Sequence, residues 1–160
     1  MERFTAHIAT GSWKGDDPGP PTGTLSLPFE RREKTRQRTS LQSGEEIGVM
    51  LPRGTVMRGG DRLVSETGRV IEVAAAPEPV STVRSDSAQA LARVAYHLGN
   101  RHVRVQVAAG WLRYLSDHVL DDMVRGLGLD PETETTPFEP EAGAYGDHVH
   151  GRHQLHDHAH

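Results

Sequence analysis

The sequence predicts an α+β protein with a β-rich N-terminal domain (a small sandwich), a ferredoxin-like domain and a disordered histidine-rich tail. Residues 1–76 alternate short apolar runs with turn residues, which is typical of small all-β domains. Residues 77–144 give strand and helix signals in the order βαββαβ, the ferredoxin-like arrangement. Residues 145–160 contain six of the ten histidines and almost no apolar side chains, so we expect this tail to be disordered without metal.

The composition excludes several classes of protein. The 160 residues include no cysteine, which rules out disulfides, thiolate metal sites and cysteine catalysis. Aromatic residues make up only 5%, so we expect no large apolar ligand cavity. No apolar run approaches the roughly 18–20 residues of a membrane span, and the N-terminus does not read as a signal peptide. We therefore expect a soluble, cytoplasmic protein with no membrane partner.

In the first domain, turn residues separate the predicted strands, which are Leu25–Phe29, Ile47–Leu51 and Val70–Ala74. A basic run, residues 31–38, has five cations and one anion. A nucleic-acid patch is one interpretation of such a run. Because the run has no interleaved aromatics and the chain is acidic, we favour a solvated strand face or a partner-docking surface, and expect no nucleic-acid partner.

The second domain is expected to begin after a linker, residues 75–79. Ser85, Asp86 and Ser87 supply cap chemistry for a helix over 88–98, which Gly99 and Asn100 end. Residues 102–107 alternate strictly, which predicts a strand with His102 on the face opposite its valines. The remaining predicted elements are a strand over 80–83, a strand over 111–114, a helix capped by Ser116 or Asp117, and an edge strand over 132–136.

The histidines indicate a metal-binding function. Neutral imidazole suits Ni, Zn and Cu, and a terminal histidine tract is a compositional signal for metal binding. An expression tag is the alternative, but tags are usually uninterrupted. One or two residues mostly separate the tail histidines, which are the candidate ligands His148, His150, His153, His156, His158 and His160.

Three histidines outside the tail are further candidates. His102 alone makes a poor site, but two chains related by a two-fold axis would each contribute one imidazole to a shared site. His97 lies in a last helical turn, where contact with the helix dipole is the alternative to an auxiliary ligand role. His118 opens the second helix, either as a surface residue or as an auxiliary ligand.

Enzymatic motifs are lacking. The sequence has no phosphate-binding G-x-x-x-x-G-K-[ST] loop and no H-E-x-x-H motif. A flexible metal-binding tail is better suited to carrying ions than to fixing a transition state, which needs preorganised groups. We therefore expect a protein that is not an enzyme.

Several motifs together resemble the UreE urease accessory protein family of nickel metallochaperones. They cover most of the chain, and they are Leu51–Thr55, Gly59–Asp61, Tyr96–His102, Leu112–Tyr114, Asp117–Met123 and Pro137–Tyr145. The block Gly99–His102, followed by PFEPEAGAY and a histidine-rich tail, is highly specific. Where some members have a further histidine, two places before His118, this chain has Ser116, and where many have proline it has Arg104.

The resemblance implies a fold, a site and partners. It implies a chaperone-like peptide-binding N-terminal domain, and a homodimer in which His102 and its symmetry mate bind nickel. Tail histidines complete that site in the family, which points first to His148 and His150. The implied partners are the urease GTPase UreG and the urease accessory complex. We therefore expect a carrier that delivers Ni²⁺, for which Zn²⁺ or Cu²⁺ can substitute; the alternative is a general histidine-rich storage or buffering protein for these metals.

Overall fold

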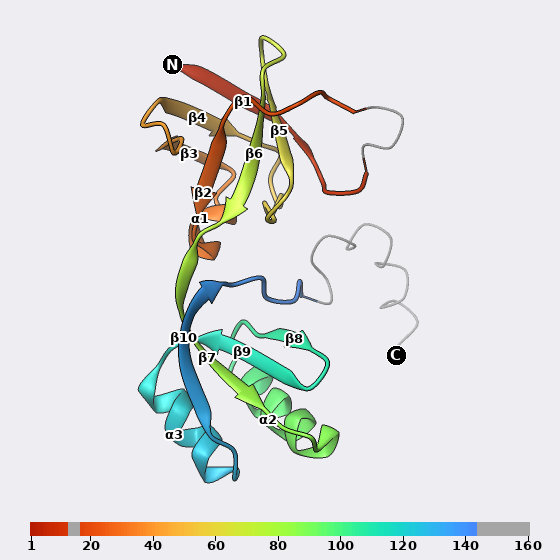
Figure 1. Ribbon diagram of the computed structural model, residues 1–160, viewed down its shortest axis with the longest axis vertical. Coiled ribbons are helices and arrows are strands. Elements are labelled where there is room, and N and C mark those ends of the chain that lie inside the picture. The colour runs from red at the N-terminus through yellow and green to blue at the C-terminus, as the bar shows by residue number, and fades with distance from the viewer. Residues whose placement is uncertain (13–16, 144–160) are drawn as a thin grey trace, which may run out of the picture. The chain divides into compact units, whose positions relative to one another are not determined.

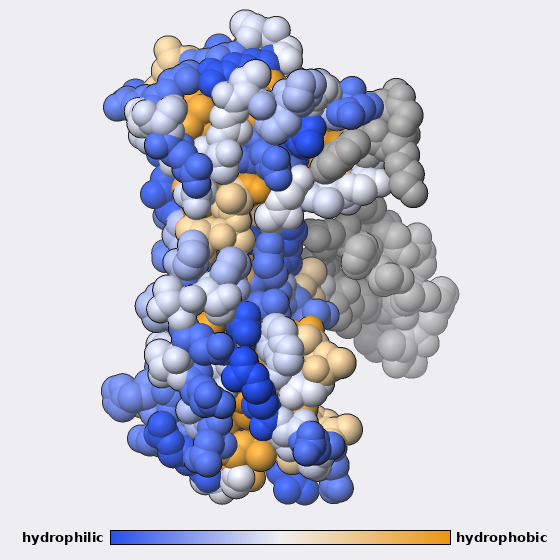
Figure 2. Space-filling view, in the orientation of Figure 1, coloured by the Kyte–Doolittle hydropathy of each residue, from blue (hydrophilic) through white to orange (hydrophobic). Residues whose placement is uncertain are grey.

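Two compact units, Met1–Ala75 and Ala76–Glu141, make up the computed structural model, which describes residues 1–12 and 17–143 (Figure 1). Hydrophilic and intermediate residues cover most of the face drawn in Figure 2, and its apolar areas are small. The tail, residues 145–160, lies outside the described residues, so its disorder stays a prediction.

The first unit is built on one mixed six-stranded sheet with the order β2-β6-β5-β1-β4-β3. Neighbours β1 and β4 are parallel, as are β2 and β6, and the remaining pairs are antiparallel. The Gln42 N–H donates to the Thr24 carbonyl at 2.9 Å, so the two edges of the sheet approach each other there. In place of the two stacked sheets of a sandwich, the unit has one sheet that curls on itself. Its elements are β1 (Glu2–Ile8), β2 (Thr24–Leu27), α1 (Phe29–Arg32), β3 (Arg36–Ser40), β4 (Glu46–Met50), β5 (Arg62–Ser65) and β6 (Val70–Ala75).

The core of this unit comes from the apolar runs that predicted its strands. Buried residues alternate with less buried ones along β2 and β5, as expected when one face of a strand packs inward. Each such aliphatic or aromatic side chain stabilises the fold by roughly 1.5–3 kcal/mol on burial. The buried cluster comprises Phe4, Leu25, Leu27, Leu41, Ile47, Val49, Leu51, Met57, Leu63, Ile71 and Val73.

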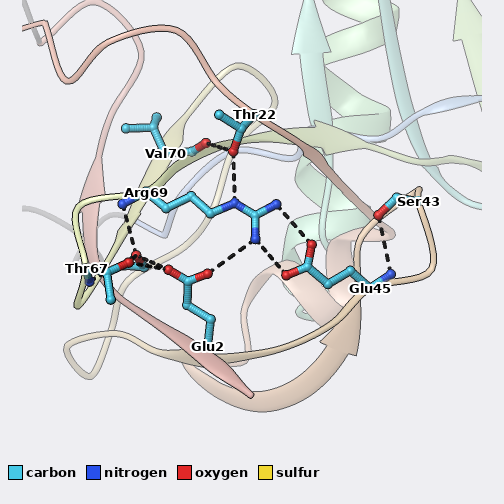
Figure 3. A network of polar contacts seen from close by, with 8 residues as sticks. Glu2, Thr22, Ser43, Glu45, Thr67, Arg69 and Val70 are labelled. Carbon is cyan, nitrogen blue, oxygen red and sulfur yellow. Dashed lines mark hydrogen bonds and ion pairs between the residues drawn. The ribbon is translucent and has the colours of Figure 1, made fainter.

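A charged network ties β1 to two turns of the same unit (Figure 3). The Arg69 guanidinium donates to both carboxylate oxygens of Glu45, at 2.6 and 3.0 Å, and to Glu2 at 3.3 Å. The hydroxyls of Ser65 and Thr67 donate to the other Glu2 oxygen. These hydroxyl hydrogen bonds are the main cause that lowers the pKa of Glu2, and the hydrogen bonds from Arg69 lower the pKa of Glu45. The network therefore holds both carboxylates in the charged state.

The basic run does not lie on a single solvated face. Arg32 is fully buried on α1, where its Nε donates to the Leu27 carbonyl at 3.0 Å and one Nη donates to the Met57 carbonyl at 3.2 Å. Its guanidinium also stacks over the Phe29 ring, 5.2 Å from the centroid. The expectation of a solvated strand face is therefore wrong for Arg32, which is a structural residue. Only the last part of the run lies on a strand, β3.

The second unit has the order of elements that the sequence predicts, βαββαβ. Its four strands form an antiparallel sheet with the order β10-β7-β9-β8. Within the described residues, no helix is long and apolar enough to cross a membrane. The elements are β7 (Pro77–Arg84), α2 (Ala88–Asn100), β8 (Gln106–Ala108), β9 (Trp111–Leu115), α3 (His118–Gly126) and β10 (Pro131–Pro137).

The predicted linker is instead the start of a strand. β6 ends at Ala75 and β7 begins at Pro77, so one residue separates the two strands. The two prolines, Pro77 and Pro79, pair only with β10, because the pairing of β7 with β9 starts at Val80. Proline lacks an N–H and is tolerated in a strand where no neighbour needs that donor. The stretch is therefore extended and paired despite its linker-like composition.

Both predicted helix starts are confirmed. The Ser87 hydroxyl accepts from the Ala90 N–H, and the Asp117 carboxylate accepts from the N–H groups of the first turn of α3. Such caps stabilise a helix by about 1 kcal/mol each. The apolar faces of both helices pack on one buried cluster, which comprises Val83, Val94, Leu98, Leu112, Tyr114 and Val124.

Candidate metal centre

The backbone around His102 forms a Schellman motif that ends α2. The His102 N–H donates to the Gly99 carbonyl at 2.9 Å, and the Val103 N–H donates back to the Leu98 carbonyl at 3.1 Å. These are the two reverse bonds that define the motif. The hydrophobic contact that usually accompanies it is present as well, because Leu98 is a core residue and Val103 packs against the same cluster. The position of His102 is therefore fixed by the end of the helix and anchored to the core.

His102 occupies a conformation that glycine normally takes. Its φ is +60°, and it is the only residue other than glycine with positive φ among residues 1–12 and 17–143. The left-handed region costs an L-residue roughly 1–2 kcal/mol, which is why this position of a Schellman motif is usually glycine. Strain of this kind concentrates at functional sites. The imidazole is also exposed, so the backbone holds it out toward solvent.

The predicted strand over 102–107 is wrong in its first four residues. β8 begins only at Gln106, because the residues that end α2 are committed to the Schellman bonds and not to a sheet. Val103 and Val105 are half-buried against the core, but Val107 is 53% exposed, so the three valines do not share one buried face. The prediction that His102 points away from the core nevertheless agrees with its exposure.

The structure does not bring the other candidate histidines into a complete site. His97 is half-buried in the last turn of α2 and packs edge-on against Tyr96, with ring centroids 5.1 Å apart. His118 is exposed at the first position of α3. Ser116, two places before His118, accepts a hydrogen bond from the Ser81 hydroxyl at 3.2 Å. Within residues 1–12 and 17–143, no three histidine, aspartate or glutamate side chains are grouped so that they could hold a metal ion.

The tail histidines cannot be placed around His102. His148, His150, His153, His156, His158 and His160 all lie outside the described residues. Their role as ligands therefore stays a prediction. Within the described part of the chain, the exposed His102 presents a single imidazole, which is too few ligands for a metal site on its own.

An apolar groove lies beside α2 on the same unit. Its volume is about 340 Å³, and its walls are mostly apolar side chains of α2 and the β8–β9 hairpin. Sequence reasoning missed this surface, because the alternation over 102–107 placed Val107 in the core. The residues that line it include Ala88, Leu91, Ala92, Ala95, Val107 and Trp111.

Two polar pairs that sequence reasoning did not find stabilise the units. In the first unit, the buried Asp61 carboxylate contacts His7 Nε2 at 2.7 Å and accepts from the Thr10 and Arg58 N–H groups. Burial raises the pKa of Asp61, but these hydrogen bonds outweigh burial and hold it below its usual value. In the second unit, the buried Tyr114 hydroxyl donates to Asp121 at 2.6 Å, and burial together with this partner raises the pKa of the tyrosine.

Comparisons with known proteins assign the family. Residues 5–76 match the UreE urease accessory protein N-terminal domain, and residues 78–160 match the C-terminal domain of the same family. Both domains of a two-domain accessory protein therefore follow one another in this chain. The chain belongs to the UreE urease accessory protein family, as its motifs predict.

Curated relatives support the assignment over most of the chain. The urease accessory protein UreE of Alkalilimnicola ehrlichii is 59% identical over 127 residues, which cover 79% of this chain and 78% of the relative. The protein of the same name from Pseudomonas putida strain W619 is 54% identical over 138 residues, or 86% of each chain. That of Proteus mirabilis is 54% identical over 126 residues, or 79% of this chain and 78% of its own length.

Proposed function

We propose that this protein is a urease maturation chaperone that carries Ni²⁺ and delivers it, in the cytoplasm, for assembly of the urease active site. Family membership supports the accessory role, and the exposed, strained His102 supports a metal-binding one. The protein acts as a carrier and not as an enzyme. Its partners are the urease GTPase UreG and the urease accessory complex.

The metal site is completed by a second copy of the chain. One exposed imidazole is too few for a stable site, whereas two copies related by a two-fold axis double every ligand. The helix α2 ends two residues before His102, and an apolar groove lies beside this helix. This groove supports a dimer, because exposed apolar surface is stabilised when a partner protein covers it. In this proposal His102 and its symmetry mate hold one Ni²⁺ at the centre of a homodimer.

The tail captures and hands over the ion. Its closely spaced imidazoles suit Ni²⁺, Zn²⁺ and Cu²⁺ alike, so the tail raises capacity more than selectivity. We propose that His148 and His150, which lie nearest to the second unit in sequence, complete the coordination at His102. The remaining tail histidines exchange ions stepwise with this site.

A general metal storage protein is the second candidate. The histidine content of the tail favours it, since storage needs only many weak ligands and no partner. The two proposals differ in what they require of His102. Delivery depends on this residue, whereas storage depends on the tail alone.

Urease activation at limiting nickel tests the proposal. Apo-urease would be mixed with its purified accessory proteins and either the natural chain, the His102→Asn variant, or a chain truncated after Tyr145. Asparagine tolerates left-handed backbone but is not a nickel ligand of comparable strength, so it is the matched substitution. Loss of activation in His102→Asn supports delivery when the truncated chain, which lacks His148 and His150 but keeps His102 and its symmetry mate, retains part of the activation. The reverse result overturns it in favour of storage.

A further inference from the structure

The first unit has a hollow lined by cations that have no carboxylate partner among the residues that the structure describes. Its volume is about 540 Å³, and its walls are residues 33–36 on one side and residues 51–53 on the other. Lys34, Arg36 and Arg53 line it and are all exposed. We call this feature the cationic hollow. Glu33 is its one acidic lining residue.

The cations of the cationic hollow differ from other arginines of the same unit. Arg3 is paired with Glu66 at 2.9 Å, and Arg69 is paired with two glutamates. By contrast, no ion pair involves Lys34, Arg36 or Arg53 within residues 1–12 and 17–143. Arg3 and Arg69 thus have their charge balanced by carboxylates, whereas Lys34, Arg36 and Arg53 form a positive patch on an acidic protein.

Both walls of the hollow are held by hydrogen bonds. The Thr55 N–H and hydroxyl donate to the Pro52 carbonyl, and Gly54 has φ +88°, as the third residue of a type II turn requires. This turn presents Arg53. On the opposite wall, the Gln37 side-chain amide donates to the Lys34 carbonyl at 2.9 Å. The backbone beneath the cations is thus preorganised, which reduces the entropy lost on binding.

The adjoining strand β3 extends the positive surface with a regular spacing. Arg36 and Arg38 lie on the same exposed face of β3, because side chains alternate along a strand. Residues two apart on a strand are separated by about 7 Å. An extended peptide with acidic residues at alternate positions has the same spacing, so it could place successive carboxylates opposite Arg36 and Arg38.

We propose that the cationic hollow and the exposed face of β3 form a docking site for an extended acidic segment of a partner protein. Nucleic acid fits less well, because none of the described residues that line the hollow is aromatic and the chain as a whole is negative. The hollow also exposes the apolar ring of Pro52, which suits peptide side chains better than phosphates. The site goes beyond nickel carriage, since it requires neither His102 nor the tail.

Fluorescence anisotropy on the full chain tests the docking site. The probe is a short fluorescein-labelled peptide of alternating glutamate and alanine, and a chelator removes all metal, so failure of nickel binding does not affect the result. We expect Arg36→Ser and Arg53→Ser each to weaken binding roughly three- to five-fold, and the double variant roughly ten-fold or more, as for partly exposed charge pairs. All three variants should keep the circular dichroism and melting temperature of the natural chain.

Arg3→Ser is the matched control, because it removes the same charge from an exposed but paired arginine of the same unit. Binding that survives in Arg3→Ser and falls in the double variant supports the docking site. Equal loss in both variants shows general charge attraction and overturns the proposal. A labelled single-stranded oligonucleotide that binds more tightly than the peptide, and displaces it, also overturns it in favour of nucleic acid.

Discussion

Replacing His102 by glycine should stabilise the fold although it removes the proposed ligand. The left-handed backbone at φ +60° costs histidine roughly 1–2 kcal/mol, and glycine adopts it without that penalty. Glycine also lowers the free energy of unfolding by about 0.4–1 kcal/mol, because it increases the conformational entropy of the unfolded chain. The expected net gain is about 0.5–1 kcal/mol, which corresponds to a rise of a few degrees in the melting temperature of the second unit.

Thermal unfolding followed by circular dichroism, in the presence of a chelator, measures this gain without any contribution from bound metal. Arg101→Gly is the matched control. It introduces glycine one residue earlier, where φ is −97° and there is no strain to relieve. We expect Arg101→Gly to lower the melting temperature and His102→Gly to raise it. If both variants are destabilised equally, His102 is not strained, and the reasoning that links strain to function at this residue fails.

Three further outcomes are expected. Truncation after Tyr145 should lower the number of nickel ions bound per chain in calorimetry yet leave one site that His102→Asn removes. Tyr114→Phe should cost about 1–2 kcal/mol in urea unfolding, because Asp121 loses its donor. Hydrogen bonds lower the pKa of Asp61 in the folded state, so its contribution to stability is present above its ordinary pKa of 3.8 and is lost as pH falls below that value. The melting temperature of Asp61→Asn should therefore change less with pH, in the range below about 4, than that of the natural chain. If both proteins lose stability equally as pH falls, Asp61 is not the group responsible.

The helices of the second unit could be predicted from the sequence because their signals are local. Ser87 and Asp117 are followed by apolar residues at helical spacing, and both caps form as expected. The edge strand β10 follows from β-branched residues between turn residues. Such signals depend on neighbours within a few positions, so tertiary contacts did not need to be known.

The errors arise where a distant or competing interaction decides the local structure. Residues 102–107 alternate like a strand, but the bonds that end α2 take the first residues. Arg32 lies in a run that looks solvated, but its guanidinium donates to the Leu27 carbonyl at the end of β2 and to the Met57 carbonyl, and it is buried in the core. Pro77 and Pro79 resemble a linker, but their strand has only one neighbour there. Each of these outcomes depends on hydrogen bonds to other parts of the chain, which the local composition of a segment does not reveal.

The candidate site could be predicted only in part. His102 stood out because of its motif and its placement on a polar face, and the structure adds an unexpected backbone strain. The basic run over 31–38 indicated one wall of the cationic hollow, but the opposite wall and the groove beside α2 could not be predicted, because each feature forms between segments that are separate in sequence. The histidines of the tail gave the clearest signal of metal binding, yet they lie outside the described residues.

Nickel calorimetry of the natural chain beside His102→Asn tests the central claim most directly. We expect a tight phase at about one ion per two chains in the natural protein, followed by weaker tail sites. In His102→Asn the tight phase should disappear while the weaker sites remain. An unchanged isotherm would contradict a shared site at His102 and would assign nickel binding to the tail alone.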